Sequence, residues 1–142
     1  MSEDKTTELA RRFVEAAWSN SGGYATLEAL AAPEFSVKYS LMPAPIEGVE
    51  AYCALLRQTR ASLEDIYIKF VHVATQGNTA VFSWEGGGTH KGEIMGIPGT
   101  GSALHWTGIS IVEVTDGKVT KEWGEEDSAR VLRQLGVIPA GI

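Results

Sequence analysis

The sequence is poor in cysteine and histidine, the residues from which disulfides and most zinc sites are built. Cys53 is the only cysteine, and the three histidines stand in separate segments. An internal disulfide is therefore excluded, and no zinc-site spacing of Cys and His is present. We expect a protein without a metal or other cofactor, and a single thiol is typical of a reducing compartment.

Clustered basic residues and long apolar runs are also missing. Twelve Lys and Arg against 18 Asp and Glu give a net charge of -6, and the basic residues are scattered along the chain. This pattern does not favour binding to a phosphate backbone. No apolar run approaches the roughly 20 residues that span a bilayer, and the polar, acidic amino terminus is unlike a secretory signal. We expect a cytoplasmic protein that binds neither nucleic acid nor membrane.

The first half of the chain has mainly helical patterns. Its 142 residues, 44% of them hydrophobic, suffice for one core, so we treat residues 1–142 as a single domain. Apolar residues recur at helical spacing over 7–18, with shorter helical segments at 24–31 and 49–61. A strand-like segment at 34–41 is closed by two prolines.

The second half has the composition of β-strands. Residues that are β-branched or aromatic are concentrated in 66–75, 79–89, 103–115 and 119–123. Gly77-Asn78 and Asp116-Gly117 are compact turn signals between these segments, and a short helix is expected at 127–135. Helices followed by strands predict an α+β domain with an antiparallel sheet.

Two segments resemble the SnoaL-like polyketide cyclase and ester cyclase family. The first is the run from Gly88 to Gly101, GTHKGEIMGIPGTG, and the second is the ordered set of Asp116-Gly117-Lys118-Val119, Trp123, Asp127 and the final LRQLG. The resemblance implies the nuclear transport factor two-like fold, in which a cone-shaped, curved antiparallel sheet and three to four helices enclose a pocket. It also implies a homodimer.

The same resemblance implies a range of functions. Members of the family include cyclases that close a polyketide ring by an intramolecular aldol step, using an acidic residue and no metal. Related folds include epoxide hydrolases, isomerases and binding proteins, so the fold indicates where a site lies without fixing its reaction.

Three positions depart from the family's pattern. Gly99 stands where a second proline is common, Gly22-Gly23 where an acidic residue is common, and Glu113 where a basic residue is frequent. These departures bear on the substrate more than on the fold.

Asp127 is the first candidate for a general acid or base. It matches the acidic position after the tryptophan of the final motif, and burial beside an apolar pocket would raise its pKa into a useful range. The alternative is an ordinary helix N-cap, because Ser-Ala-Arg follows it. Glu125 lies on the same side of an extended strand as Trp123 and Asp127, and it is the candidate acid or base if Asp127 is only a cap. The alternative for Glu125 is plain solvent exposure.

Two histidines are further candidates. Folding the hairpin about Asp116-Gly117 is expected to bring His105 near Asp127, where the pair could move a proton. His90 could orient a substrate oxygen. An exposed strand histidine and a loop or dimer-contact histidine are the respective alternatives.

Aromatic side chains are expected to form the pocket walls and to stack on a flat ligand, with core packing as the alternative for each. These are Trp84, Trp106, Trp123, Phe82 and Tyr39. Glu85 alternates with Trp84, so only one of the two can face the pocket.

The leading hypothesis is a cofactor-independent acid/base enzyme that acts on a small apolar or polycyclic carbonyl compound, as a polyketide cyclase or an isomerase does. An epoxide hydrolase of the same fold and a non-catalytic small-molecule binding protein are the alternatives.

Overall fold

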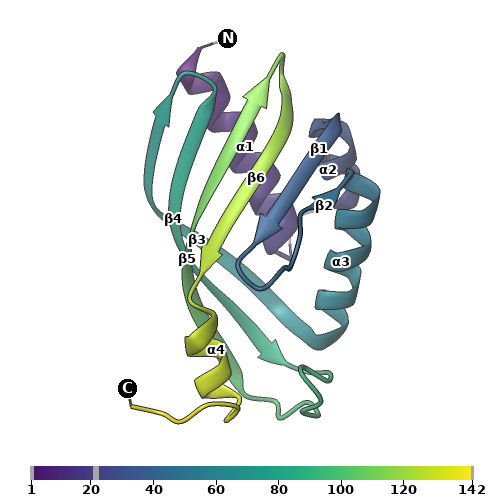
Figure 1. Cartoon of the computed structure of the whole chain (residues 1–142), viewed down its shortest axis with the longest axis vertical. Helices are drawn as coiled ribbons and strands as arrows, with labels where there is room; N and C mark the ends of the chain where they lie inside the picture. The colour runs from purple at the N-terminus through teal and green to yellow at the C-terminus, as the bar shows by residue number, and fades with distance from the viewer. Residues whose placement is uncertain (1, 21–22, 142) are drawn as a thin grey trace.

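The structure, a computed structural model, describes residues 2–20 and 23–141, which form four helices and one six-stranded sheet (Figure 1). In chain order the elements are α1 (Glu3–Trp18), α2 (Tyr24–Leu30), β1 (Ala31–Tyr39), β2 (Ile46–Glu47), α3 (Val49–Ser62), β3 (Leu63–Gln76), β4 (Thr79–His90), β5 (Ala103–Thr115), β6 (Lys118–Glu126) and α4 (Ser128–Gln134). The predicted α+β class is confirmed. The short strand β2 was not predicted, and Gly22, one of the departures from the family pattern, lies outside the described residues.

The sheet is mixed, with the strand order β2-β1-β6-β5-β4-β3. Among the described strands, four of the five neighbouring pairs are antiparallel, as predicted, and β1 pairs with β6 in parallel. A hairpin turn would force an antiparallel partner, but β1 reaches β6 from the helical half of the chain, so no turn fixes its direction.

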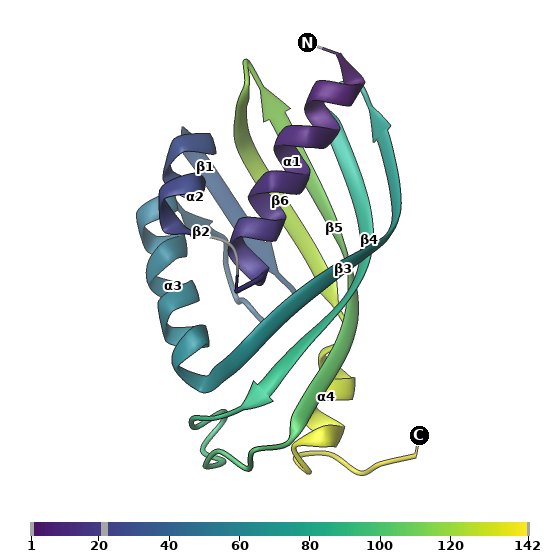
Figure 2. The same ribbon diagram turned by 180° about the vertical axis from the view of Figure 1, so that it is seen from behind.

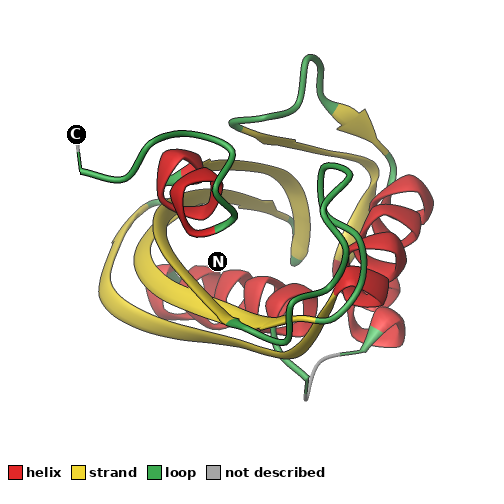
Figure 3. Ribbon diagram, turned by 90° about the horizontal axis from the view of Figure 1, so that it is seen from below, coloured by secondary structure: helices red, strands yellow, loops and turns green. Residues whose placement is uncertain are grey.

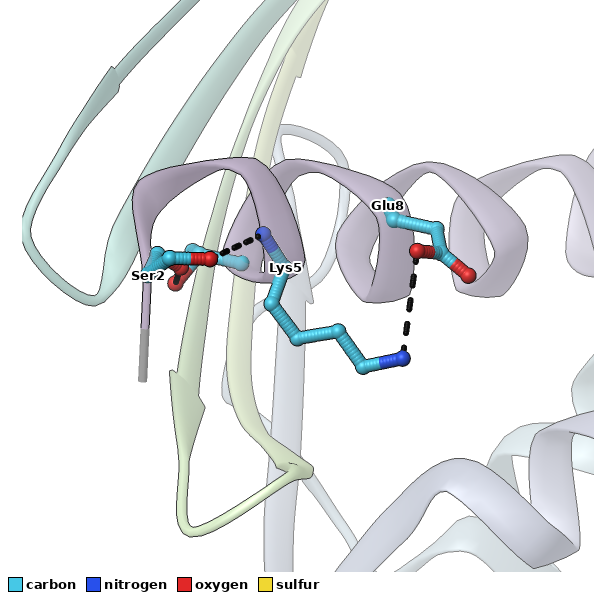
Figure 4. Close-up of polar contacts among 4 residues, drawn as sticks. Ser2, Lys5 and Glu8 are labelled. Carbon is cyan, nitrogen blue, oxygen red and sulfur yellow. Dashed lines mark hydrogen bonds and ion pairs between the residues drawn. The ribbon is translucent and has the colours of Figure 1, made fainter.

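The first helix begins four residues earlier than its apolar pattern predicted. The Ser2 hydroxyl accepts a hydrogen bond from the Lys5 backbone N–H at 3.1 Å and caps the helix (Figure 4). Lys5 and Glu8 then form an exposed ion pair at 3.8 Å. The cap supplies the start signal that hydrophobic periodicity alone does not contain.

The first three helices pack on one face of the sheet, while the other face is left without a helical layer over most of its area (Figures 1 and 2). Phe13 of α1, Phe35 of β1 and Tyr52 of α3 form the centre of this packing, with ring centroids 5.1 to 6.2 Å apart. The strands bend strongly without closing into a barrel, as the view from below shows (Figure 3). Two register shifts in β3 add to the bend.

The Asp116-Gly117 turn and a neighbouring β-bulge together fix the register of the last hairpin. Asp116 and Gly117 both have positive φ, 52° and 77°, the backbone conformation of a tight type I′ turn. A one-residue shift between Val114 and Glu113 then brings Val112 opposite Glu122 and Ser110 opposite Gly124. Because side chains alternate along a strand, Glu122, Gly124 and Glu126 face inward while Trp123 and Glu125 face outward.

Two glycines on the inner face make room for aromatic rings. A Cβ at Gly108 would overlap the indole of Trp84, and a Cβ at Gly124 would lie 2.6 Å from Cδ1 of Tyr39. Trp84 is further held by the hydrogen bond from its Nε1 to the Ser110 hydroxyl at 3.0 Å. Both rings therefore occupy space above sheet positions that have no side chain.

We expect Gly108→Ala to lower the free energy of unfolding by about 1–3 kcal/mol, because the added methyl group displaces the Trp84 indole from a packed position. Urea denaturation measures this loss. The control is Gly23→Ser, since a Cβ at Gly23 meets nothing within 4 Å and serine is a favoured N-cap for α2. A Gly108→Ala protein as stable as the control would contradict the packing argument.

Candidate functional site

A cavity of about 230 Å³ lies on the inner face of the sheet, between the strands and α4. Its wall is mostly apolar: the aromatic residues Trp18, Tyr39, Trp84 and Trp106, and aliphatic residues that include Leu63, Ile66, Leu104, Val131, Leu132 and Leu135. Such a space fits a small, largely apolar molecule.

Glu126, at the end of β6, is the one charged side chain among the described residues that line this cavity. Its Oε1 accepts hydrogen bonds from the Ser40 backbone N–H at 3.2 Å and from the Ser40 hydroxyl at 2.8 Å. Burial raises the pKa of Glu126, and the Ser40 bonds partly oppose that rise. Both Ser40 bonds engage a single oxygen, so they fix the carboxylate without covering it.

A second carboxyl group, that of Glu122, lies four residues earlier on the same face of β6 and is only 1% exposed. Its Oε2 accepts a hydrogen bond from the Tyr39 hydroxyl at 2.9 Å. Its Oε1 has no hydrogen-bond partner within the described part of the chain. The Tyr39 hydroxyl also contacts the Tyr52 hydroxyl and accepts from Trp18 Nε1 at 3.1 Å.

The buried network contains no positive charge to balance Glu122. Burial raises the pKa of Glu122 to about 7, the Tyr39 hydrogen bond lowers it, and the negative charge of Glu126 raises it. Burial, and then the charge of Glu122, also raise the pKa of Tyr39 and of Tyr52 well above the ordinary value. Glu122 is therefore the member of the network that changes charge near neutral pH.

Asp127 and Glu125 lie outside the cavity. Asp127 is the N-cap of α4, and its side chain accepts from the Arg130 backbone N–H at 3.1 Å. Both acidic residues border a separate, shallow hollow on the outer face, together with His72 and Ser83. Asp127 thus has the geometry of a helix N-cap, and Glu125 is exposed to solvent.

Neither candidate histidine lines the cavity. The ring Nδ1 of His105 is 3.3 Å from the Arg130 guanidinium Nη1, and the His105 backbone pairs with the Gln134 side chain. The structure thus places Arg130, rather than Asp127, in contact with the His105 ring. His90 is fully buried, its Nδ1 is 3.1 Å from the Thr100 hydroxyl, and its Nε2 has no partner among the described residues.

The structure divides the five aromatic candidates. Tyr39, Trp84 and Trp106 line the cavity. Phe82 is buried in the core, 5.1 Å from the Phe70 ring. Trp123 faces outward, is 39% exposed and lies under the Lys121 ammonium. The strand alternation that turns Trp123 outward is the same one that turns Glu122 and Glu126 inward.

The sequence pattern did not identify Glu122 and Glu126, because a β-bulge changes the side of β6 that they face. Counted from the Asp116-Gly117 turn, Val112 would pair with Lys121, but the register shift between Val114 and Glu113 pairs it with Glu122. Regular alternation from the buried Val119 would turn Trp123 inward and Glu122 outward. The prediction that Trp123 faces inward is wrong for this reason.

An open, curved sheet with three helices on one face and an inner cavity defines the α+β cone of nuclear transport factor two-like proteins. The family model for the SnoaL-like polyketide cyclases matches residues 8–135, so the chain belongs to this family. The resemblance of its motifs to that family is confirmed.

Solved structures agree with this assignment. TsrD from Streptomyces laurentii is 28% identical, with a TM-score of 0.81 and with 97% of this chain and 99% of that chain covered. A candidate SnoaL-like polyketide cyclase from Jannaschia sp. CCS1 is 18% identical (TM-score 0.85; 96% and 95% covered). An LEH-like epoxide hydrolase from M. tuberculosis is 14% identical (TM-score 0.74; 95% and 92% covered). The last two show the fold alone.

No curated protein matches the sequence. Of the helices within residues 2–20 and 23–141, none is both long enough and apolar enough to span a membrane.

The buried carboxyl group predicts a specific dependence of stability on pH. A glutamate in an unfolded chain has a pKa of about 4.3, and the folded pKa of Glu122 is about 7. The folded state therefore holds the proton more tightly, so stability falls as pH rises from about 4.3 and the loss is complete above about 7. The full loss is on the order of 4 kcal/mol.

Urea denaturation at several pH values between 4 and 8 tests this dependence. We expect Glu122→Gln to flatten the decline, and Glu125→Gln, an exposed neighbour on the same strand, to leave it unchanged. An equally steep decline in the Glu122→Gln protein would show that other groups cause it.

Proposed function

We propose that the protein is an acid/base enzyme for a small apolar or polycyclic carbonyl compound, of the polyketide cyclase or isomerase type, with Glu126 as the group that takes up and returns the proton. The observation that carries the proposal is the position of Glu126 as the one charged group on the described wall of an apolar cavity. A carboxylate in such surroundings is a stronger base than the same group in water.

The proposed step begins with a substrate whose carbonyl group activates a neighbouring C–H bond. Glu126 takes the proton from this α-carbon, and the resulting enolate attacks a second carbonyl in a cyclase or is reprotonated elsewhere in an isomerase. Ser40 supports this role because its two hydrogen bonds hold the carboxylate in one orientation. The step requires no bound cofactor.

The aromatic wall supports a flat substrate. Trp84 and Trp106 on the sheet and Trp18 at the end of α1 offer faces or edges on which a polycyclic ring system could stack. The fixed position of Trp84 over Gly108 means that one such surface exists before the ligand binds.

Epoxide hydrolysis is less well supported by the same cavity. It requires a base that activates water and an acid that protonates the opening ring, and a single carboxylate lines the described wall. The M. tuberculosis epoxide hydrolase is similar in fold, at 14% identity. A protein that binds the ketone without transferring a proton would be a non-catalytic binding protein.

Deuterium exchange tests the proposal with 2-acetylnaphthalene, a flat ketone with exchangeable α-protons. We expect the protein to accelerate exchange of the methyl protons in D₂O, followed by NMR, and Glu126→Gln to reduce the acceleration by about 10²–10⁴-fold.

Two variants provide matched controls for this exchange. Glu125→Gln changes the adjacent, outward-facing carboxylate, and Asp127→Asn keeps a residue that can cap α4. We expect both to retain the acceleration. Loss of exchange in Asp127→Asn with full exchange in Glu126→Gln would reassign the base to Asp127.

We also propose that two copies of the chain pair through the uncovered outer face of the sheet. Exposed apolar side chains gather there on three strands: Val71, Ile109, Ile111 and Trp123. Ile111 and Trp123 are neighbours in the β5–β6 register, so these two side chains form one apolar surface at the centre of this face. A second copy would offer the same surface, as a two-fold dimer requires.

Sedimentation of two lysine variants tests this pairing. We expect the native protein to sediment as a dimer and Ile109→Lys as a monomer, because the charge would be buried in the interface. Val137→Lys, at an exposed apolar residue near the carboxyl terminus, is expected to remain dimeric. A native monomer would contradict the proposal.

A further inference from the structure

Tyr39 links the wall of the cavity to the buried Glu122. Tyr39 lines the cavity, and its oxygen has three partners: Trp18 Nε1, the Tyr52 hydroxyl and Glu122 Oε2. An indole N–H can only donate, so the Tyr39 oxygen always accepts from Trp18. What remains variable is the direction of the other two hydrogen bonds.

A phenol has a single proton to give, and the charge of Glu122 decides where it goes. An ionised carboxylate can only accept hydrogen bonds. The Tyr39 hydroxyl therefore donates to it, and Tyr52 then donates to the Tyr39 oxygen. A protonated Glu122 needs no donor and can itself donate. In this second state the Tyr39 proton is free of Glu122, and a ligand oxygen in the cavity then competes with the Tyr52 oxygen to accept it.

The unpartnered Glu122 oxygen supports the protonated state. Oε1 of Glu122 is fully buried and has no donor within the described residues. An ionised oxygen in that position is costly, whereas a neutral acid is less so. The surroundings therefore permit a proton on Glu122 near neutral pH.

We propose that Glu122 is a positioning residue whose proton allows Tyr39 to donate its hydroxyl hydrogen to the carbonyl oxygen of a ligand in the cavity. Binding of a ketone is then coupled to protonation of Glu122. The inference rests on the proposed function for the ligand class alone and does not require that catalysis occurs.

In the proposed cyclisation the same pair would supply the acid. Attack of the enolate breaks the C=O π bond of the second carbonyl and leaves an alkoxide. Tyr39 gives its proton to the alkoxide oxygen, and Glu122 gives its proton to the Tyr39 oxygen, so Glu122 ends as a carboxylate. The proton that Glu126 took from carbon balances this loss, and exchange with water restores both carboxyl groups between turnovers.

Few titratable groups face Glu122 within the described chain. Tyr39 comes from β1, Tyr52 from α3 and Glu126 from β6, while α1 contributes the non-titrating indole of Trp18. Both tyrosines keep their protons near neutral pH, because burial raises the pKa of each. Glu126 is therefore the one other group on these described elements whose titration would contribute to the pH profile. The variant Glu126→Gln removes that contribution.

The test compares two probes of nearly equal shape. 2-Acetylnaphthalene has an oxygen that accepts a hydrogen bond, and 2-ethylnaphthalene does not. Quenching of tryptophan fluorescence gives the dissociation constant of each between pH 6 and pH 8. For the native protein we expect ketone affinity to fall by about tenfold over this range, since Glu122 loses its proton with a pKa of about 7. The hydrocarbon affinity is expected to stay constant.

Variants assign the pH dependence to its group. Glu122→Gln and Tyr39→Phe are expected to bind the ketone with no change between pH 6 and pH 8, and either suffices if the other does not fold. Glu125→Gln, which changes an exposed neighbour on the same strand, is expected to keep the tenfold change. Glu126→Gln is expected to keep a pH dependence with a lower midpoint, because the charge of Glu126 raises the pKa of Glu122.

Three results would overturn the inference: ketone binding that is independent of pH in the native protein, a pH dependence that survives in Glu122→Gln, or no binding of the ketone. The deuterium-exchange experiment tests catalysis and this experiment tests binding, so either can fail without the other. Without α-proton exchange but with pH-linked ketone binding, the proposed catalysis would be wrong and the role of Glu122 would stand.

Discussion

The register of the β5–β6 hairpin is the constraint on which the site depends. A tight turn at Asp116-Gly117 and the β-bulge beside it set which residues of β6 face the helices. A slip of one residue would turn Trp123 and Glu125 inward and expel the two carboxyl groups from the apolar interior. The fold thus places Glu122 and Glu126 on the inner face through backbone geometry, against the preference of their own side chains for water.

That placement has an energetic cost which other residues reduce. Ser40 supplies two donors to Glu126, and Tyr39 supplies one to Glu122. None of these donors is charged, so the network stabilises the carboxylates less than an arginine would. Both carboxyl groups therefore keep a raised pKa, which is the property that acid/base chemistry near neutral pH requires.

Much of the fold could be predicted from the sequence, because it follows from local patterns. Apolar periodicity placed α1, β-branched runs placed β3 to β5, and Asp116-Gly117 marked the last hairpin. The parallel pairing of β1 with β6 could not be predicted, since no turn or spacing encodes it. The family assignment came from short motifs rather than from these patterns.

The site was harder to predict than the fold. Tyr39, Trp84 and Trp106 were identified because aromatic residues are natural cavity walls, and they line the cavity. The acidic residues were chosen by their resemblance to a motif position, which favoured Asp127. Which of the four neighbouring acidic residues point inward depends on strand alternation, on the β-bulge in the β5–β6 pair and on the start of α4. An error of one residue reverses the answer.

The parallel β1–β6 pairing also bears on how the chain folds. Tyr39 and Glu122, which meet across this pairing, are 83 residues apart in the sequence, whereas the hairpins join strands that follow one another. Contacts of such long range carry a larger loop-closure entropy and tend to form late. The tyrosine–glutamate network is thus present only in the completed fold. A molecule that has folded its hairpins but has not yet docked β1 would have the sheet without the Tyr39–Glu122 hydrogen bond.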